Sequence, residues 1–188
     1  MRLTVVNHLT LDGVMQAPAS ADEDTSGGFA HGGWAVPYQD EVMGRFMGAR
    51  MSSTEQGTLL FGRRTYEHMY SYWPKQTGPI TDTLNRARKY VASNSLSDPL
   101  PWENSTLLSG DVPARIRELD LDAVILGSGR LIHALLREDL IDALVLTIHP
   151  LVLGSGLRMF PDDGVPARFR LVESTLTTTG VIIAVYER

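Results

Sequence analysis

The chain of 188 residues is 43% hydrophobic and 21% charged, with a formal net charge of -5. These proportions are ordinary for a soluble globular protein, and the length predicts one domain over residues 1–188 with a core of its own. The absence of cysteine excludes disulfides, thiolate metal sites and cysteine nucleophiles, and an acidic balance without a basic run argues against nucleic-acid and membrane-surface binding.

The first residues, Met1–His8, are too polar for a signal peptide. No apolar run approaches the ~20 residues that cross a bilayer. We therefore expect a cytoplasmic protein without a membrane partner.

The first predicted element is a strand over residues 3–11, whose apolar side chains alternate on one face. Asn7 and His8 interrupt this alternation, which suggests that polar groups serve a purpose near the strand's end. Asp12-Gly13 then ends the strand, usually as a tight turn. A carboxylate on such a rigid element can also hold the ring nitrogens of a ligand.

A long loop over residues 14–37 follows the first strand. Loops of this length in a compact domain are usually lids, binding loops or disordered segments. The acidic start, Asp22-Glu23-Asp24, is predicted to be solvated surface. Trp34 and Tyr38, toward its aromatic end, are candidate substrate-binding residues, and a helix is predicted from about Asp40.

A strand over residues 57–61 leads into a helix that ends at Pro74. The apolar stripe of this helix is predicted to be core, and its members are Tyr66, Met69, Tyr70 and Trp73. The later predicted elements are a short helix around Leu84 capped by Thr81-Asp82, strands over 89–93 and 106–108, a helix opened by Asp111 and Pro113, a strand over 123–126, a helix over 131–136, a strand over 144–148, and a hairpin of strands over 169–176 and 181–186.

Strands that alternate with helices predict parallel crossover connections, and the terminal hairpin adds antiparallel pairing. The predicted fold class is therefore α/β, with a mixed and mostly parallel sheet.

Two strand-to-glycine turns are candidate anion sites. The first delivers Gly62-Arg63-Arg64-Thr65 to a helix start, with Thr65 able to cap the helix, and the second is Gly127-Ser128-Gly129-Arg130. Free N–H groups of a first helical turn favour an anion, and guanidinium groups add forked donors. The first turn alone is better explained as a strand-to-helix turn with solvated arginines. The second lacks the third glycine of the Rossmann fingerprint, and by itself it is explained equally well by turn chemistry or by an anion site. Their occurrence together indicates a dinucleotide.

Other polar residues remain open to two interpretations. Ser93-Asn94-Ser95 follows a strand and is explained by turn chemistry or by a ligand contact. Asp40 and Glu41 suit a helix start, or one of them faces a pocket as a proton source. The five histidines include no pair at metal-ligand spacing, so no metal is predicted.

Together these residues resemble the dihydrofolate reductase superfamily, and more closely the reductase-domain family of the riboflavin-biosynthesis deaminase/reductase. The motifs that carry this resemblance are Leu11-Asp12-Gly13, Gly62–Glu67, Val124–Gly129, Leu140–Leu144 and His149–Gly156. The resemblance implies helices on both faces of a mostly parallel sheet, an antiparallel C-terminal hairpin, NADPH as hydride donor and a homodimer.

The resemblance also implies roles for individual residues. Gly62, Arg63, Arg64 and Thr65 correspond to a site for the adenosine-side phosphates, including the 2′-phosphate; Ser93 and Asn94 to the adenine ribose site; and Gly127, Ser128, Gly129, Arg130 and Leu131 to the pyrophosphate site. Trp34, Pro37 and Asp40 echo the pterin-binding stretch of dihydrofolate reductases with a different spacing. The segment Met51–Gln56 departs from the riboflavin reductases because it has no basic residue.

The leading hypothesis is an NADPH-dependent reductase that transfers hydride to a small pyrimidine-, pterin- or flavin-precursor-like molecule. Asp12 is the first candidate for binding or protonating this substrate, and Asp40 is the second. The alternative hypothesis is a nucleotide- or flavin-binding module without catalytic turnover.

Overall fold

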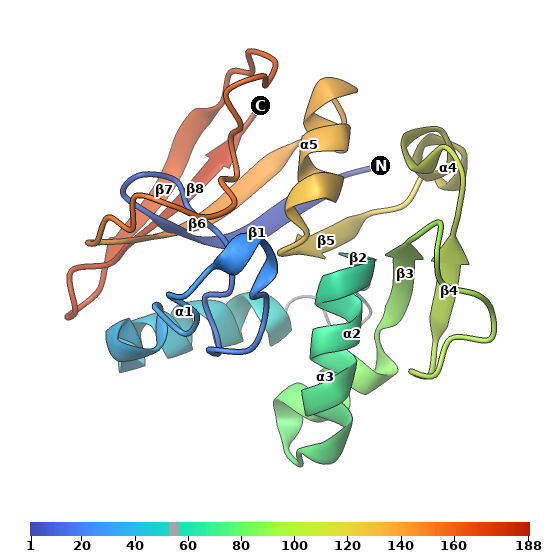
Figure 1. Ribbon diagram of the computed structural model, residues 1–188, viewed down its shortest axis with the longest axis horizontal. Helices are drawn as coiled ribbons and strands as arrows, with labels where there is room; N and C mark the ends of the chain where they lie inside the picture. Colours follow the sequence, from blue (N-terminus) through green and yellow to red (C-terminus); the bar gives the residue numbers. More distant parts are fainter. Residues whose placement is uncertain (53–56) are drawn as a thin grey trace.

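The computed structural model describes residues 1–52 and 57–188, so most of the segment Met51–Gln56 lies outside the described residues. Eight strands form one sheet in the order β4-β3-β2-β5-β1-β6-β8-β7 (Figure 1). The strands are β1 (Leu3–Thr10), β2 (Thr58–Gly62), β3 (Arg88–Ala92), β4 (Ser105–Leu108), β5 (Ala123–Leu126), β6 (Ala143–His149), β7 (Arg170–Leu176) and β8 (Ile182–Glu187).

The helices connect successive strands along the chain. They are α1 (Glu41–Ser52), α2 (Arg63–Tyr72), α3 (Pro79–Arg86), α4 (Val112–Leu119) and α5 (Gly129–Arg137), with short 3₁₀ turns at Ser26–Gly28, Val36–Tyr38 and Trp73–Lys75. Across the described ranges, none of these helices is long and apolar enough to span a membrane.

The sheet is parallel from β4 to β6 and antiparallel at its C-terminal end. β1 pairs in parallel with both β5 and β6, and β2 pairs in parallel with both β3 and β5. β8 then pairs antiparallel with β6 and with β7. The predicted mixed α/β sheet with a C-terminal antiparallel hairpin is confirmed.

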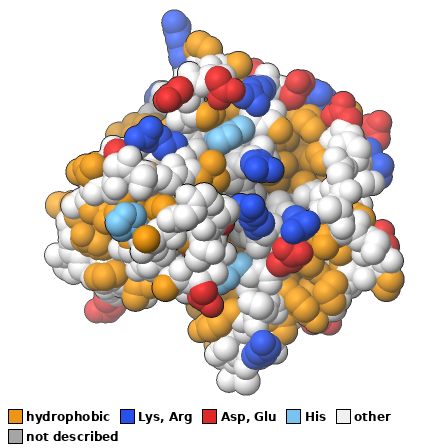
Figure 2. Space-filling view, in the orientation of Figure 1, with side chains coloured by type: hydrophobic (Ala, Val, Ile, Leu, Met, Phe, Trp, Pro, Cys, Tyr) orange, Lys and Arg blue, Asp and Glu red, His pale blue; other side chains and the backbone are white. Residues whose placement is uncertain are grey.

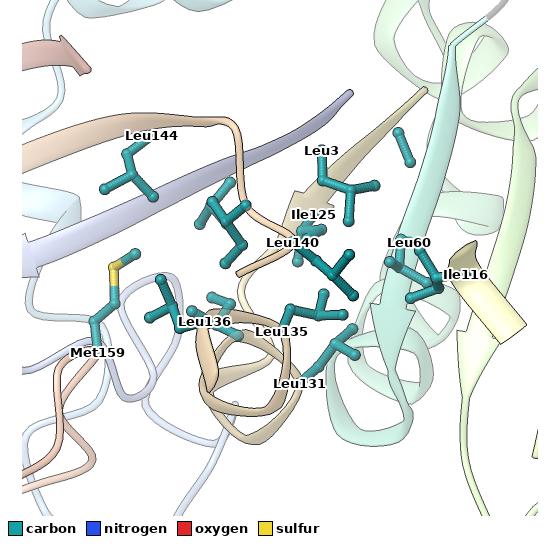
Figure 3. Close-up of a cluster of buried hydrophobic side chains, with 14 of the residues drawn as sticks. Leu3, Leu60, Ile116, Ile125, Leu131, Leu135, Leu136, Leu140, Leu144 and Met159 are labelled. Atoms are coloured by element: carbon teal, nitrogen blue, oxygen red, sulfur yellow. The ribbon is translucent and has the colours of Figure 1, made fainter. Parts of the chain in front are cut away.

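One face of the sheet packs against α4 and α5. Leu60 of β2 and Ile125 of β5 share a buried cluster with Ile116 of α4 and with Leu131 and Leu135 of α5 (Figure 3). Leu3, Leu60 and Ile125 are fully buried. Burial of each such side chain contributes about 1.5–3 kcal/mol, so this cluster anchors the start of α5 to the strands beneath it.

The other face is covered by α1, α2 and α3. Phe61 of β2, Tyr66 of α2 and Leu84 of α3 share a second cluster with Met69, Tyr70 and Trp73, so the predicted core role of the α2 stripe is confirmed. Alternation along each strand sends its neighbouring side chains to opposite faces, which explains why Leu60 and Phe61 belong to different clusters.

The loop over residues 14–37 has a small core of its own. Val14, Phe29 and Trp34 are buried together, and Leu151 and Leu153 pack against them. Trp34 donates its Nε1–H to the carbonyl of Gln16 at 2.7 Å. The loop is therefore fixed in place above the ends of β1 and β6.

Helix starts differ in part from the prediction. The Asp111 carboxylate caps α4 by accepting a hydrogen bond from the Ala114 N–H, as predicted. Thr81 and Asp82 lie inside α3, which begins after Gly78, so their predicted capping role is wrong. Thr65 likewise lies inside α2, whose N-cap is Gly62. In both helices glycine precedes the first turn. Gly78 has a φ of 123°, which favours glycine, whereas Gly62 has an extended backbone.

Candidate functional site

The two predicted anion turns lie side by side because β2 and β5 are neighbouring parallel strands. The Gly62 N–H donates to Ser128 Oγ at 2.7 Å, and Ser128 Oγ–H donates to Thr65 Oγ1 at 2.9 Å. A Cβ on Gly127 would lie only 3.2 Å from Thr65 Oγ1. The glycines of both turns therefore allow a close contact between the starts of α2 and α5.

Both helix starts present unsatisfied N–H groups. Neither α2 nor α5 has a side-chain cap, and neither has an acidic residue in its first turn. In α5 the left-handed Gly127 and Ser128 precede the helix, and the Ile132 N–H donates to the Ser128 carbonyl. The amides of Gly129 to Leu131 are thus the orphan donors of the first turn, and a helix dipole points the same way. Two such starts in contact form a surface suited to an extended anion.

Arginine side chains surround these helix starts. Lys and Arg side chains gather near the middle of the face in Figure 2, in the region where Figure 1 shows α2 and α5 beginning. Arg63 donates to Ser95 Oγ at 2.7 Å and pairs with Glu67. Arg130 is exposed, with no ion pair within residues 1–52 and 57–188.

Arg64 joins α2 to the long loop. Its guanidinium lies 3.1 Å from Asp24 Oδ2 and donates to Ser26 Oγ at 2.8 Å. Asp24 was predicted to be solvated surface, but its side chain is only 19% exposed and carries this contact. The sequence pattern could not reveal it because the two residues are 40 positions apart.

Ser93 and Asn94 lie beside the first turn, since β3 is the other neighbour of β2. Ser93 Oγ accepts hydrogen bonds from the Ser95 and Leu96 N–H groups, and Asn94 Oδ1 accepts one from the Gly110 N–H. These bonds are turn chemistry. The structure brings both residues to the predicted edge of the sheet without leaving their side-chain oxygens free.

Asp12 lies at the carboxyl end of β1 and holds a neighbouring turn. Its carboxylate accepts hydrogen bonds from Thr10 Oγ1–H at 2.6 Å, from the Gly154 N–H at 2.8 Å and from the Leu153 N–H at 3.2 Å. These hydrogen bonds, that of Thr10 first, lower the pKa of the Asp12 carboxyl. A carboxyl stabilised as its anion is a poor proton donor, so this geometry favours a positioning role.

Asp40 lies just before α1 and connects it to the turn between β7 and β8. It accepts from the Met43 N–H at 2.8 Å and from both the N–H and the hydroxyl of Thr178 at 2.6 Å. The Met43 and Thr178 bonds lower the pKa of the Asp40 carboxyl. Asp40 is thus the N-cap of α1, as the helix-start interpretation predicted.

Trp34 and Tyr38 are brought together around His149, which belongs to a family motif in the sequence but was not predicted as a site residue. Both rings contact His149 edge-on, with ring centroids 5.1 Å and 5.5 Å away. His149, at the end of β6, is fully buried, and its Nε2 lies 2.9 Å from Nδ1 of His8 on β1. In the sequence, the only indication of a role for His8 is that it interrupts the apolar alternation of the first strand.

Burial keeps this histidine pair neutral. Desolvation lowers the pKa of His8 to about 4, and desolvation together with His8 lowers the pKa of His149 to about 4. Among the described residues, no carboxylate raises the pKa of either ring. At neutral pH the pair is therefore uncharged, and each ring has one N–H and one bare nitrogen.

We expect acid to destabilise the protein through this pair. Unfolded histidine titrates near pH ~6.5, so between pH 6.5 and 4 the unfolded chain binds more protons than the folded one. The associated stability is complete above the unfolded pKa and is lost as the pH falls toward the folded value, by on the order of 3 kcal/mol for each histidine. Urea denaturation across this range should show a much smaller loss for His8→Gln/His149→Gln. The native protein and this variant have the same carboxylates. Equal losses of stability in the two would therefore show that carboxylates, and not the histidine pair, cause the acid destabilisation.

A broad hollow of about 1180 Å³ lies elsewhere, at the amino ends of β2, β3 and β4. Arg86, Arg88, Trp102 and Ser105 are among its lining residues. None of the predicted site residues lines it, and ligands of parallel α/β sheets bind outside the carboxyl ends of the strands. The candidate site is therefore the carboxyl edge of β1, β2, β5 and β6.

Several solved structures have a similar fold. A protein provisionally assigned to riboflavin biosynthesis from Shewanella sp. PV-4 matches with a TM-score of 0.68 and 22% identity, covering 100% of this chain and 99% of that chain. Dihydrofolate reductase from Enterococcus faecalis, complexed with NADP(H) and RAB-propyl, matches with a TM-score of 0.62 and 15% identity over 100% and 96%. A pyrimidine reductase-like protein from Corynebacterium diphtheriae matches with a TM-score of 0.63 and 14% identity over 99% and 91%.

Two uncharacterized proteins of Bacillus subtilis (strain 168) are similar in sequence. YyaP is 28% identical over 137 residues, covering 69% of this chain and 72% of YyaP. YwjB is 30% identical over 118 residues, covering 61% of this chain and 64% of YwjB, so less than two thirds of that relative is matched. Residues 2–183 match the RibD C-terminal domain family. Because that match spans nearly the whole chain, the protein belongs to the RibD C-terminal domain family.

Proposed function

We propose that this protein is an NADPH-dependent reductase that transfers hydride to a pyrimidine-, pterin- or flavin-precursor-like ring. The observation that carries the proposal is the contact between two uncapped helix starts, bordered by Arg63, Arg64 and Arg130, at the carboxyl edge of the sheet. Family membership and the fold shared with a dihydrofolate reductase complexed with NADP(H) support a reductase role.

The proposed nucleotide site uses both turns. The amides of Gly129, Arg130 and Leu131, with Gly127 and Ser128 before them, would receive the pyrophosphate. Gly62, Arg63, Arg64 and Thr65 would hold the 2′-phosphate, with Ser93 and Asn94 near the adenine ribose. Guanidinium groups suit this role because their forked donors match phosphate oxygens.

When bound, NADPH supplies a hydride to an electron-poor carbon. The chain's own part is to position the substrate ring and exclude water. Trp34 and Tyr38 would border the ring, and the loop over residues 14–37, held by its own core, would cover it. We assign Asp12 and Asp40 to positioning, because both carboxylates are stabilised as anions by structural hydrogen bonds.

The same observation supports the second candidate, a nucleotide-binding module without turnover. Neither proposed carboxylate is suited to donating a proton, so a catalytic acid is not evident among them. Fluorescence titration with NADPH, followed by oxidation assays with pterins, pyrimidines and quinones, separates the two. Binding with turnover supports the reductase, binding without oxidation of NADPH by any ring supports the module, and absence of binding contradicts both.

We expect Asp24→Asn to tighten NADPH binding. The Asp24 carboxylate forms an ion pair with the Arg64 guanidinium. A 2′-phosphate must therefore compete with Asp24 for this guanidinium. Ion pairs near the surface contribute ~0.2–1 kcal/mol, which predicts an affinity gain of up to about fivefold. The matched control is Asp22→Asn, which removes the same charge from a carboxylate bonded to Ser20. Equal Kd values for the two variants, measured by titration, would refute the competition.

A further inference from the structure

His8 lies next to the proposed nucleotide site. The last parallel rung between β1 and β5 joins Val6 to Leu126, so His8, two residues further, is level with Ser128. Alternation places His8 on the same face of the sheet as Val6, which packs against α1. The register of β6 places Thr147 opposite His8 and His149 opposite Thr10. His8 thus stands between the second anion turn and the aromatic residues Trp34 and Tyr38.

The four ring nitrogens of the pair have different surroundings. His8 Nδ1 and His149 Nε2 share one hydrogen bond of 2.9 Å. His149 Nδ1 is buried and has no partner among the described residues. His8 is half-buried, and its Nε2 is not one of the buried unpartnered atoms of the described part. His8 Nε2 is therefore the one nitrogen of the pair left open to solvent or a ligand.

The orphaned nitrogen decides which way the shared hydrogen bond runs. If His8 donated, neutral His149 would carry its proton on Nδ1, as a buried N–H without an acceptor. If His149 donates from Nε2, its Nδ1 is only a bare lone pair. Unpaired buried N–H groups are rarer and more costly than under-satisfied acceptors. The second arrangement is favoured, and it leaves His8 with its proton on Nε2.

The packing holds His149 in this arrangement. Trp34 meets the His149 ring at an interplanar angle of 90° and Tyr38 at 78°. The His149 ring is fully buried and cannot itself touch a substrate. It acts on the site only through its contact with His8.

We propose that His149 fixes His8 as the neutral Nε2–H form, and that this N–H binds a carbonyl oxygen on the substrate ring. This inference rests on the proposed function. His8 is then a specificity-determining residue, and His149 is a positioning residue. A neutral N–H binds a neutral carbonyl and disfavours an amino group at the same position, because two donors would face each other.

The tautomer is tested without any ligand. Long-range ¹⁵N-correlated NMR of the imidazoles at neutral pH should show His8 as the Nε2–H form. His149→Phe, which cannot donate, and His149→Gln, whose amide can either donate to His8 Nδ1 or accept from it, should both release His8 into a mixture of tautomers. An Nδ1–H form of His8 in the native protein, or an unchanged spectrum in His149→Phe, would overturn the proposal.

Ring recognition is tested with two matched probes, 2-amino-4-oxopteridine and 2,4-diaminopteridine, by calorimetry with NADP⁺ present. The oxo ring should bind about tenfold more tightly or better. His8→Leu should reduce this ratio to near one. His8→Gln should reduce it as well, because its amide can either donate to the carbonyl or accept from the amino group. Equal affinities in the native protein, or failure of both rings to bind, would overturn the inference.

NADPH titration of the same proteins separates this inference from the proposed function. NADPH binding that persists in the His8 variants, together with the expected ratio, supports both. If the native protein does not bind NADPH, the proposed function fails. If it binds NADPH but does not discriminate between the two rings, only the role of His8 fails.

Discussion

Arg63→Ala/Arg64→Ala is expected to weaken NADPH binding by about 100-fold while leaving NADH binding nearly unchanged. Hydrogen bonds to charged groups contribute ~1.5–3 kcal/mol each, and NADH lacks the 2′-phosphate that both guanidiniums would hold. The two guanidiniums are themselves exposed, and they can exchange their present partners, which are Ser95 and Glu67 for Arg63 and Asp24 and Ser26 for Arg64. Fluorescence titration with both nucleotides measures the effect.

The matched control is Arg86→Ala/Arg88→Ala. These arginines line the hollow at the amino ends of β2 to β4, at the opposite end of the strands. The control removes the same net charge, so any general electrostatic attraction falls equally in both double variants. Equal weakening of NADPH binding in the two would show that Arg63 and Arg64 make no specific contact.

Lys89→Met is expected to lower the free energy of unfolding by about 3 kcal/mol. Lys89 is fully buried, and its Nζ donates to the carbonyls of Asn85, Ala87 and Glu103 at 2.9–3.1 Å. The ammonium also lies 4.6 Å from the ring centroid of Trp102. Burial lowers its pKa to about 8, so it is still charged at neutral pH. Methionine would fill the space and leave three carbonyls without a donor.

Urea denaturation measures this loss, with Arg88→Met as the control. Arg88 is the neighbouring residue, and it is exposed. Surface substitutions of this kind usually change stability by less than about 0.5 kcal/mol. A similar small change in Lys89→Met would mean that water replaces the ammonium at the three carbonyls. NADPH affinity should be unaffected in both variants, since β3 begins far from the proposed site.

Much of the local structure follows from short-range patterns in the chain. The strand over 123–126 has the predicted bounds, and the α2 stripe packs as predicted, because side-chain periodicity alone tells which face of an element is buried. The two strand-to-helix turns were also visible, since glycine and the loss of apolar alternation mark them, but both helices begin earlier than predicted, α2 at Arg63 and α5 at Gly129. The sequence patterns did not reveal the roles of residues whose hydrogen-bond partners are far away in the sequence.

Asp12 and Asp40 illustrate this limit. A carboxylate at a strand end or a helix start is equally able to bind a ligand or to satisfy backbone N–H groups. Which of these applies depends on what the fold places opposite it: Leu153 and Gly154 for Asp12, and Thr178 for Asp40. Those partners are 138 to 142 positions away, so no local pattern reports them.

The amino-acid sequence by itself determined the alternation of strands and helices, the family resemblance and the two turns with free amides. Tertiary structure alone decided that β2 and β5 are neighbours, which joins turns 66 positions apart, and that β1 and β6 are neighbours, which joins His8 to His149. The physical reason is that periodicity and turn chemistry act over a few residues, whereas strand order depends on how the whole chain buries its apolar faces.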